Sequence, residues 1–208
     1  KITSDLKEFL ISNKINYLIT QTLSLEILDK VQYENCLVLS AGSPWIFREP
    51  LISKLGKNFY NTHQSPLPSM KGSVASYIIM YEIRSFQVCL HKVTTGIDCG
   101  NIIFRKNIFI PSSLKTPLDV NNFLQRMNRE MLKEFLIKFE NKEILEEEKQ
   151  NNFFSSYNTR LSSDINGWID WSYKVEDLDR YIRSFGNPYK GAKTFIHNKQ
   201  VNIKYVEF

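Results

Sequence analysis

Short apolar runs alternate with amphipathic segments over residues 1–61, and this alternation constrains the fold more than any other feature of the chain. Three runs are short, apolar and bounded by turn residues, as buried strands are: 15–20, 36–40 and 58–61. The segments beside them show helical spacing: 3–14, 24–31 and 48–56. Strands that alternate with helices predict a Rossmann-like α/β fold, with a mostly parallel sheet and helices on both faces.

The middle of the chain departs from this alternation. Residues 86–93 and 101–110 are both strand-like and are joined by a turn that contains glycine, so we expect an antiparallel pair. A helix is expected over 72–83. The longest helix opens at Thr116-Pro117 and keeps its apolar spacing to about residue 148, where three glutamates predict a solvated helix end.

Composition changes after residue 150, which predicts two parts. We expect a catalytic core over residues 1–150 and a small C-terminal α+β subdomain over 151–208. The segment 151–167 is rich in Asn and Ser, as linkers are, and it precedes a helix and a hairpin that turns at His197-Asn198. Because a doubly wound sheet usually opens with a strand, a first strand–helix–strand unit is expected upstream of residue 1 unless the sheet is reduced.

Bulk composition and charge narrow the possible partners. Of the 208 residues, 42% are apolar, and no apolar run approaches the roughly 20 residues that span a bilayer. The net charge of +5 is spread: residues 151–208 hold eight Lys and Arg against six Asp and Glu. Such a charge suits an anionic small molecule at least as well as nucleic acid. Three widely spaced cysteines predict reduced thiols and a cytoplasmic location, with no membrane partner.

A polar pair follows the strand at 58–61, in the stretch NTHQSPLP. Asn61 and His63 are separated by one residue, so their side chains project to the same side of an extended chain. They would lie beyond the carboxyl ends of parallel strands, where open α/β sheets bind ligands. An amide and an imidazole can stabilise an oxyanion, and neutral imidazole can accept a proton. The alternative is a polar strand end that only hydrogen-bonds to its own loops.

Asp98 lies in a second distinctive loop, TTGIDCG, in which Gly96 and Gly100 allow a sharp bend. An aspartate near His63 would orient the imidazole and raise its pKa. Taken alone, Asp98 is better explained as a turn residue of a hairpin.

Together, these two motifs resemble those of the formyltransferases that use 10-formyltetrahydrofolate. In that family an N-x-H-x-S-x-L-P run, here NTHQSPLP, is followed by a loop like LHKVTTGIDCGNII. The resemblance covers roughly residues 15–110 and implies that Asn61, His63 and Asp98 match the catalytic triad. Members of the family act on glycinamide ribonucleotide, methionyl-tRNA or amino sugars.

The chemistry that the resemblance implies requires no metal. A substrate amine attacks the formyl carbon on N10 of the folate, and Asn61 with protonated His63 would stabilise the oxyanion. Asp98, His63 and an ordered water would relay protons, and the formal base is left open. The histidines lack metal-ligand spacing, so His91 and His197 are predicted to be strand and turn residues.

The resemblance also predicts where the folate co-substrate binds. In the family, backbone groups and apolar walls hold the pterin ring at the position of SAGSPWIF, residues 40–47. The residues predicted to bind it are Gly42, Pro44, Trp45, Ile46 and, from the aspartate loop, Ile97. For Trp45 and Ile46, plain core packing is the alternative.

The C-terminal region predicts the acceptor. Residues 167–195 resemble sugar-nucleotide N-formyltransferases, which show a similar I-x-W segment, a helix ending in Arg and a P-Y-x-G-A motif. Tyr189 could stack on a pyrimidine, and cations could meet a diphosphate. These cations are Arg160, Arg183, Lys190 and Lys71. Lys71 stands where the resembled family often has an arginine. For Arg183, a cation favoured by the helix C-terminus is the alternative.

We therefore expect formyl transfer to the amine of a nucleotide-linked dideoxy-amino sugar, a dTDP-amino hexose for surface polysaccharide biosynthesis. Methionyl-tRNA formyltransferase is the alternative, and the spread charge and the short C-terminal region stand against it. A folate- or nucleotide-binding module that has lost turnover is a third alternative, which the intact set of Asn61, His63 and Asp98 disfavours. A homodimer is common in the resembled family, and no nucleic-acid partner is expected.

Overall fold

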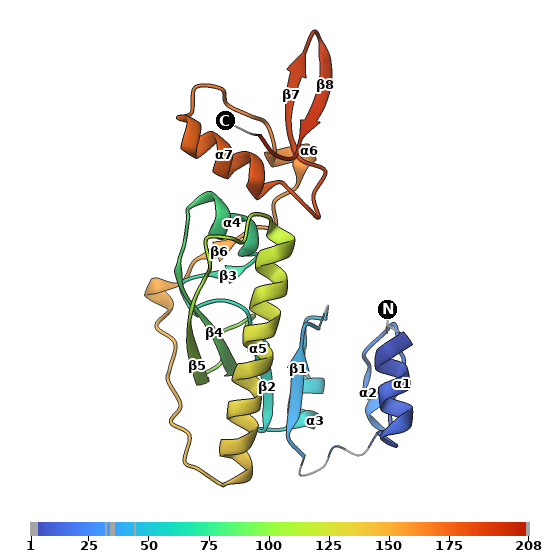
Figure 1. Cartoon of the computed structure of the whole chain (residues 1–208). Coiled ribbons are helices and arrows are strands. Elements are labelled where there is room, and N and C mark those ends of the chain that lie inside the picture. Colours follow the sequence, from blue (N-terminus) through green and yellow to red (C-terminus); the bar gives the residue numbers. More distant parts are fainter. Residues whose placement is uncertain (1–3, 32, 34–35, 44, 207–208) are drawn as a thin grey trace. The chain divides into compact units, whose positions relative to one another are not determined.

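The computed structural model describes residues 4–31, 33, 36–43 and 45–206 (Figure 1). The chain forms two compact units, Lys1–Glu34 and Asn35–Phe208. Within the described residues, no helix combines the length and the apolar character that crossing a membrane requires.

The first unit contains two helices, α1 (Ser4–Ser12) and α2 (Leu25–Leu28), the second shorter than predicted. The strand predicted at 15–20 is wrong. These residues form no strand, and Ile15 and Ile19 are 45% and 61% exposed. A strand needs a neighbour to pair its backbone N–H and C=O groups, and no described segment of this unit supplies one.

The second unit is built on a four-stranded sheet. Its strands, in spatial order, are β1 (Val38–Ala41), β2 (Phe59–His63), β4 (Ser85–Lys92) and β5 (Ile102–Phe109). β1 and β2 are parallel and are connected through the short helix α3 (Leu51–Leu55), as the alternation predicts. β4 runs antiparallel to both β2 and β5. The α/β class is confirmed, and the sheet is mixed in direction.

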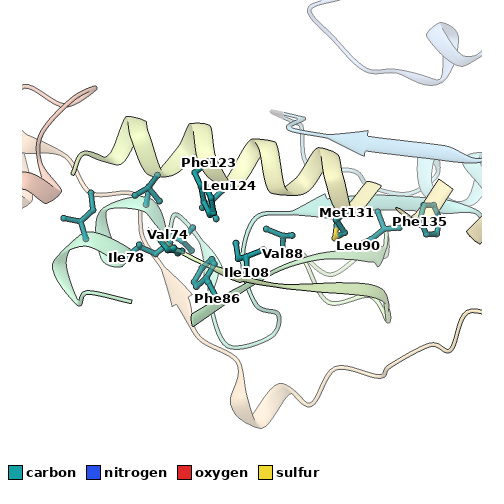
Figure 2. Close-up of a cluster of buried hydrophobic side chains, with 14 of the residues drawn as sticks. Val74, Ile78, Phe86, Val88, Leu90, Ile108, Phe123, Leu124, Met131 and Phe135 are labelled. Carbon is teal, nitrogen blue, oxygen red and sulfur yellow. The ribbon is translucent and has the colours of Figure 1, made fainter. Parts of the chain in front are cut away.

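The longest helix, α5 (Pro117–Glu140), packs on this sheet (Figure 2). A capping box starts it: Thr116 Oγ1 accepts from the backbone N–H of Asp119, whose carboxylate accepts from the N–H of Thr116. Apolar residues recur at three- and four-residue spacing, so one face of α5 is buried against β4 and β5. Fully buried side chains of this core include Val88, Leu90, Ile110, Val120, Leu124, Met131 and Phe135.

The helix ends at Glu140, so the solvated helix end predicted near residue 148 is wrong. The chain instead returns to β5, where Ile102 and Glu148 exchange two backbone hydrogen bonds of 2.8 Å. The Glu148 carboxylate also accepts two hydrogen bonds from Arg105, at 2.8 and 2.7 Å. These contacts bring residue 150 to the loop between β4 and β5.

The remaining elements lie outside the four-stranded sheet, and a second, smaller core gathers buried residues between Leu161 and Ala192. β3 (Lys71–Gly72) pairs in parallel with β6 (Tyr157–Asn158), so the segment predicted as a linker contains a strand. The other elements are α4 (Ala75–Met80), the 3-10 turn Asn152–Phe154, α6 (Ser163–Asn166), α7 (Val175–Ser184), β7 (Ala192–Ile196) and β8 (Lys199–Ile203). α4 packs against α7. The predicted C-terminal hairpin is confirmed, with His197 and Asn198 at positive φ in its turn.

Candidate active site

Strand β2 presents Asn61 and His63 on the same face, because they are separated by one residue. The antiparallel register with β4 places Asn61 opposite His91 and His63 opposite Cys89. Side chains that face each other across neighbouring strands come into contact. Asn61 Nδ2 accordingly lies 3.2 Å from His91 Nε2.

Asp98 joins this group from the loop between β4 and β5. Its backbone is in the left-handed region (φ +50°), which Asp adopts more readily than most residues. Asp98 Oδ1 lies 3.7 Å from His63 Nδ1 and 3.5 Å from His91 Nε2. The structure thus brings together Asn61, His63 and Asp98, and their catalytic roles stay predictions.

Two residues hold the Asp98 loop in place. A Cβ at Gly100 would lie 1.9 Å from the carbonyl oxygen of Lys92, so this close approach requires glycine. Gln150 is buried, and its Nε2 donates to the carbonyl oxygens of Asp98 (2.9 Å) and Gly100 (2.7 Å). The sequence carried no signal for Gln150, because the contact spans about fifty residues and depends on the chain returning to β5.

His91 is the second residue of the site that the sequence did not reveal. It is a strand residue, as predicted, but it is only 3% exposed and faces Asn61 and Asp98. Its Nδ1 donates to the backbone oxygen of Lys92 at 2.8 Å, which leaves Nε2 to face the other two side chains. Knowledge of the β2–β4 register would have identified it.

Burial sets the protonation state of the site. It lowers the pKa of His63 below its usual 6.5, although Asp98 acts in the opposite direction. The predicted rise in this pKa is therefore wrong, because burial is the larger effect. Burial alone would raise the pKa of Asp98, but the nearby His91 and the positive charge of Lys71 hold it below its usual value. At neutral pH, a neutral His63 thus lies beside an ionised Asp98.

A cavity of about 440 Å³ opens beside these residues. Its lining includes Asn61, His63, Asp98 and four of the predicted folate-binding residues: Gly42, Trp45, Ile46 and Ile97. The fifth, Pro44, lies outside the described residues. Trp45 and Ile46 are 36% and 58% exposed, so core packing does not explain them.

Polar atoms in the wall of this cavity have no hydrogen-bond partner among the described residues. They are Ser40 Oγ, His63 Nε2 and Asn128 Oδ1. Since buried polar atoms are normally paired, these three atoms have hydrogen-bonding capacity left for water or a polar ligand. Asn128 comes from α5, and its polar side chain at a buried helical position is the signal that could have revealed it.

Lys71 is buried in β3, with only 7% of its surface exposed. Its Nζ donates to Cys99 Sγ at 3.3 Å, and Cys99 is the residue that follows Asp98 in the chain. Lys71 does not line the cavity, but its charge acts on both His63 and Asp98. The predicted role in acceptor binding stays a prediction.

The four acceptor residues predicted in the C-terminal region do not line the cavity either. Arg183, in the last turn of α7, forms an ion pair with Asp179 at 2.5 Å, which agrees with the alternative of a helix-end cation. Lys190 pairs with Asp164 at 3.0 Å. Both ion pairs are at least partly exposed, so a stronger anion can compete for the cations.

Tyr189 and Arg160 lie in the same region. The Tyr189 ring packs 6.3 Å from the ring of Phe185, measured between centroids, and is partly exposed. Arg160 is exposed. Their predicted contacts with a nucleotide stay predictions.

The arrangement beside the cavity can stabilise an oxyanion and move a proton. Asn61 Nδ2 carries two hydrogens, of which one donates to His91 and the other is available to a ligand. His63 turns Nδ1 to Asp98 and has Nε2 without a partner among the described residues, so the neutral ring can accept a proton there. An amide donor, a base and a carboxylate that orients the base suit acyl transfer.

The sequence of the chain is similar to those of known formyltransferases. Residues 162–208 match the family model described as formyl transferase, C-terminal domain. Over 207 residues, 96% of the chain, the sequence is 27% identical to a methionyl-tRNA formyltransferase of Coxiella burnetii, of which it covers 63%. A second relative is the bifunctional polymyxin resistance protein ArnA of Wigglesworthia glossinidia brevipalpis, to which the sequence is 28% identical. That match covers 73% of this chain and 23% of ArnA.

A solved structure shares the fold. The chain matches the N-formyltransferase from Helicobacter canadensis, solved in complex with folinic acid and dTDP-3-aminofucose, with a TM-score of 0.67 and 26% identity. The match covers 86% of this chain and 63% of that one. The chain thus spans less than two thirds of the length of these relatives. The chain is thus similar to formyltransferases in both sequence and structure.

Proposed function

We propose that the chain is an enzyme that transfers a formyl group from 10-formyltetrahydrofolate to the amine of a nucleotide-linked amino sugar. The observation that carries the proposal is the group of Asn61, His63 and Asp98 in the wall of a cavity of about 440 Å³. Cavities of a few hundred cubic ångströms are typical of small-molecule sites. We assign catalysis to residues 1–150 and acceptor binding to residues 151–208.

The proposed reaction makes one bond and breaks one. The amine nitrogen attacks the formyl carbon, the bond from that carbon to N10 of the folate breaks, and the amine proton ends on N10. Asn61 Nδ2 donates its second hydrogen to the tetrahedral oxyanion. Neutral His63 takes the proton from the attacking nitrogen and delivers it to N10, and ionised Asp98 stabilises the imidazolium between these steps.

The walls of the cavity support the choice of folate. Trp45, Ile46 and Ile97 place partly exposed apolar surface beside the unpartnered atoms of Ser40 and Asn128. A flat ring with polar edges, such as pterin, fits such a mixture of apolar wall and convergent polar groups. The Helicobacter canadensis relative was solved with folinic acid, which supports the same class of co-substrate.

A nucleotide sugar is the proposed acceptor. The same relative was solved with dTDP-3-aminofucose, and the positive charge of this chain is spread rather than gathered in one region. We assign the diphosphate to Arg160, Arg183 and Lys190, because phosphate oxygens can replace a carboxylate in an exposed ion pair. Tyr189 is partly exposed and is assigned to the base.

Methionyl-tRNA is the second candidate acceptor. The match to the Coxiella burnetii methionyl-tRNA formyltransferase, which extends over 96% of this chain, favours it. The two candidates differ in the size and charge of the acceptor, so a direct assay separates them.

The test is a transfer assay with 10-formyltetrahydrofolate and a panel of acceptors. The panel holds dTDP- and UDP-linked 3-amino and 4-amino sugars, charged initiator tRNA and glycinamide ribonucleotide. We expect tetrahydrofolate release that depends on a sugar nucleotide. Release with tRNA alone would contradict the proposed acceptor, and no release with any acceptor would contradict the enzymatic function.

Substitutions at the site test the residue roles. We expect Asn61→Ala, His63→Ala and Asp98→Asn each to lower kcat by at least about 100-fold, the range for loss of an oxyanion donor or an acid–base group. His197→Ala, in the exposed hairpin turn, is the control and should leave kcat unchanged. Turnover close to the wild-type rate in any of the three variants would refute the role of that residue.

A further inference from the structure

His63, His91 and Asp98 each offer one metal-ligand atom, and these three atoms lie within 4.8 Å of one another. They come from β2, from β4 and from the loop that follows β4, so backbone hydrogen bonds hold two of the three donors in register. His91 is 3% exposed, and the side chains of His63 and Asp98 are 14% and 18% exposed. The cluster is thus sheltered but not sealed, and all three residues line the cavity.

Two of the three separations between ligand atoms are close to those of a zinc site, and the third is within 4.8 Å. In a tetrahedral zinc site with bonds of 2.0–2.1 Å, neighbouring ligand atoms are separated by roughly 3.3 Å. Asp98 Oδ1 lies 3.5 Å from His91 Nε2 and 3.7 Å from His63 Nδ1. Shifts of a few tenths of an ångström would bring both pairs to the required separation.

The tautomer of His91 is already the one that a metal needs. Metal-binding histidines usually donate their other ring N–H to a backbone carbonyl or a carboxylate, which fixes the ring and directs the lone pair at the ion. His91 Nδ1 donates to the backbone oxygen of Lys92 at 2.8 Å. Its Nε2 therefore carries the lone pair and faces Asp98.

We propose that this cluster is a binding site for Zn²⁺, with His63 Nδ1, His91 Nε2 and a carboxylate oxygen of Asp98 as ligands and the fourth position open to the cavity. Two imidazoles and one carboxylate favour zinc over Mg²⁺ or Ca²⁺, which prefer oxygen ligands. Because the ion occupies the groups that the proposed function assigns to proton transfer, zinc acts as an inhibitor of formyl transfer. The inhibition rests on the proposed function, whereas the binding of zinc does not.

Two contacts oppose the ion and make the site testable. Asn61 Nδ2 donates to the same lone pair of His91 Nε2, so zinc must displace this hydrogen bond. The buried cation Lys71 acts electrostatically on both His63 and Asp98. The structure therefore gives opposite expectations for two neighbouring substitutions: loss of His91 weakens zinc binding, whereas loss of the Asn61 amide strengthens it.

The experiment measures binding to tag-free, chelator-treated chain by zinc-indicator competition and by the visible absorption of bound Co²⁺. We expect one ion per chain and no competition from excess Mg²⁺. His91→Gln and Asp98→Asn should each weaken zinc binding at least tenfold, since each removes a ligand. Asn61→Ala should strengthen binding about fivefold, the equivalent of one ordinary hydrogen bond. His197→Gln, a histidine outside the cluster, should bind as the wild type does.

Two results would overturn the site. One is wild-type binding in both His91→Gln and Asp98→Asn while their thermal unfolding stays normal. The other is loss of binding in Cys99→Ser with retention in His91→Gln, which would assign the ion to the neighbouring thiol. Inhibition is read separately, as loss of tetrahydrofolate release on adding Zn²⁺ and recovery with chelator. If no acceptor supports release, the proposed function fails while the binding measurement still decides the site.

Discussion

Gln150 Nε2 donates to the carbonyl oxygen of Asp98 at 2.9 Å, although the two residues are 52 positions apart in the chain. A second bond from the same nitrogen reaches the carbonyl oxygen of Gly100 at 2.7 Å. The Gln150 side chain thus holds the loop that carries Asp98, the candidate catalytic carboxylate. The position of Asp98 therefore depends on Gln150 as well as on the residues beside it.

Gln150→Leu removes both of these bonds. We expect the free energy of unfolding to fall by about 1–3 kcal/mol, because two backbone carbonyls lose their buried donor. We also expect kcat to fall about tenfold, since a misplaced carboxylate no longer orients His63. Urea unfolding and the transfer assay measure the two effects. Gln200→Leu, the same substitution at an exposed position of β8, is the control, and equal losses in both variants would refute the role of Gln150.

Gly100→Ala tests the close approach of two backbones. The added Cβ would lie 1.9 Å from the Lys92 carbonyl oxygen, so the loop or β4 must move, and we expect a loss of about 3 kcal/mol of unfolding free energy. Gly56→Ala is the matched control. Gly56 has φ +77° and ψ −171°, a conformation almost restricted to glycine, but nothing within 4 Å of the new Cβ, so only backbone strain remains, about 1–3 kcal/mol. Urea unfolding should place the two variants in that order, and the reverse order would contradict the packing.

The depressed pKa of His63 makes stability depend on pH. In the unfolded chain His63 titrates near 6.5, whereas burial lowers its pKa in the folded state. As the pH falls through 6.5, the unfolded state takes up a proton that the folded state does not, so the free energy of unfolding decreases. His63→Gln removes this contribution. Between about pH 7.5 and pH 5.5, the wild type should therefore lose more stability than the variant in urea unfolding. Parallel pH profiles would show that His63 has no depressed pKa.

Phe135 tests the packing of α5 on the sheet. Its side chain is fully buried, and its ring meets that of Tyr60 with centroids 5.7 Å apart. Phe135→Ala should cost about 3–5 kcal/mol of unfolding free energy, the range for deleting a buried aromatic ring. Ile137→Ala, two residues along the same helix and 58% exposed, should stay within about 0.5 kcal/mol of the wild type. Similar losses in both variants would contradict the assignment of the buried face.

Local pattern predicted the elements whose signals lie within a few neighbouring residues. Apolar spacing and the Thr116-Pro117 signal predicted the start of α5, and alternation predicted the β4–β5 pair. The same reasoning failed at residues 15–20, where an apolar run looked like a strand. A run of that kind becomes a strand only when another segment pairs with it, and this condition is not local.

Some residues of the candidate site could be predicted from the sequence, and others could not. Asn61 and His63 could be predicted, because their spacing on one strand determines that they share a face. His91 and Gln150 could not, because they reach Asp98 only through the β2–β4 register and the return of the chain to β5. The sign of the pKa shift of His63 was missed as well, since burial is a property of the whole fold.

The sequence by itself determined the α/β class, the polar pair on β2 and the aspartate loop, because these depend on residue type and short spacing. The tertiary structure alone decided that Asn61, His63, His91 and Asp98 meet in the wall of one cavity. It also decided that His63 is neutral beside an ionised Asp98. The physical reason is that register and burial arise from contacts between segments far apart in the chain, and side-chain distances and pKa values follow from those contacts.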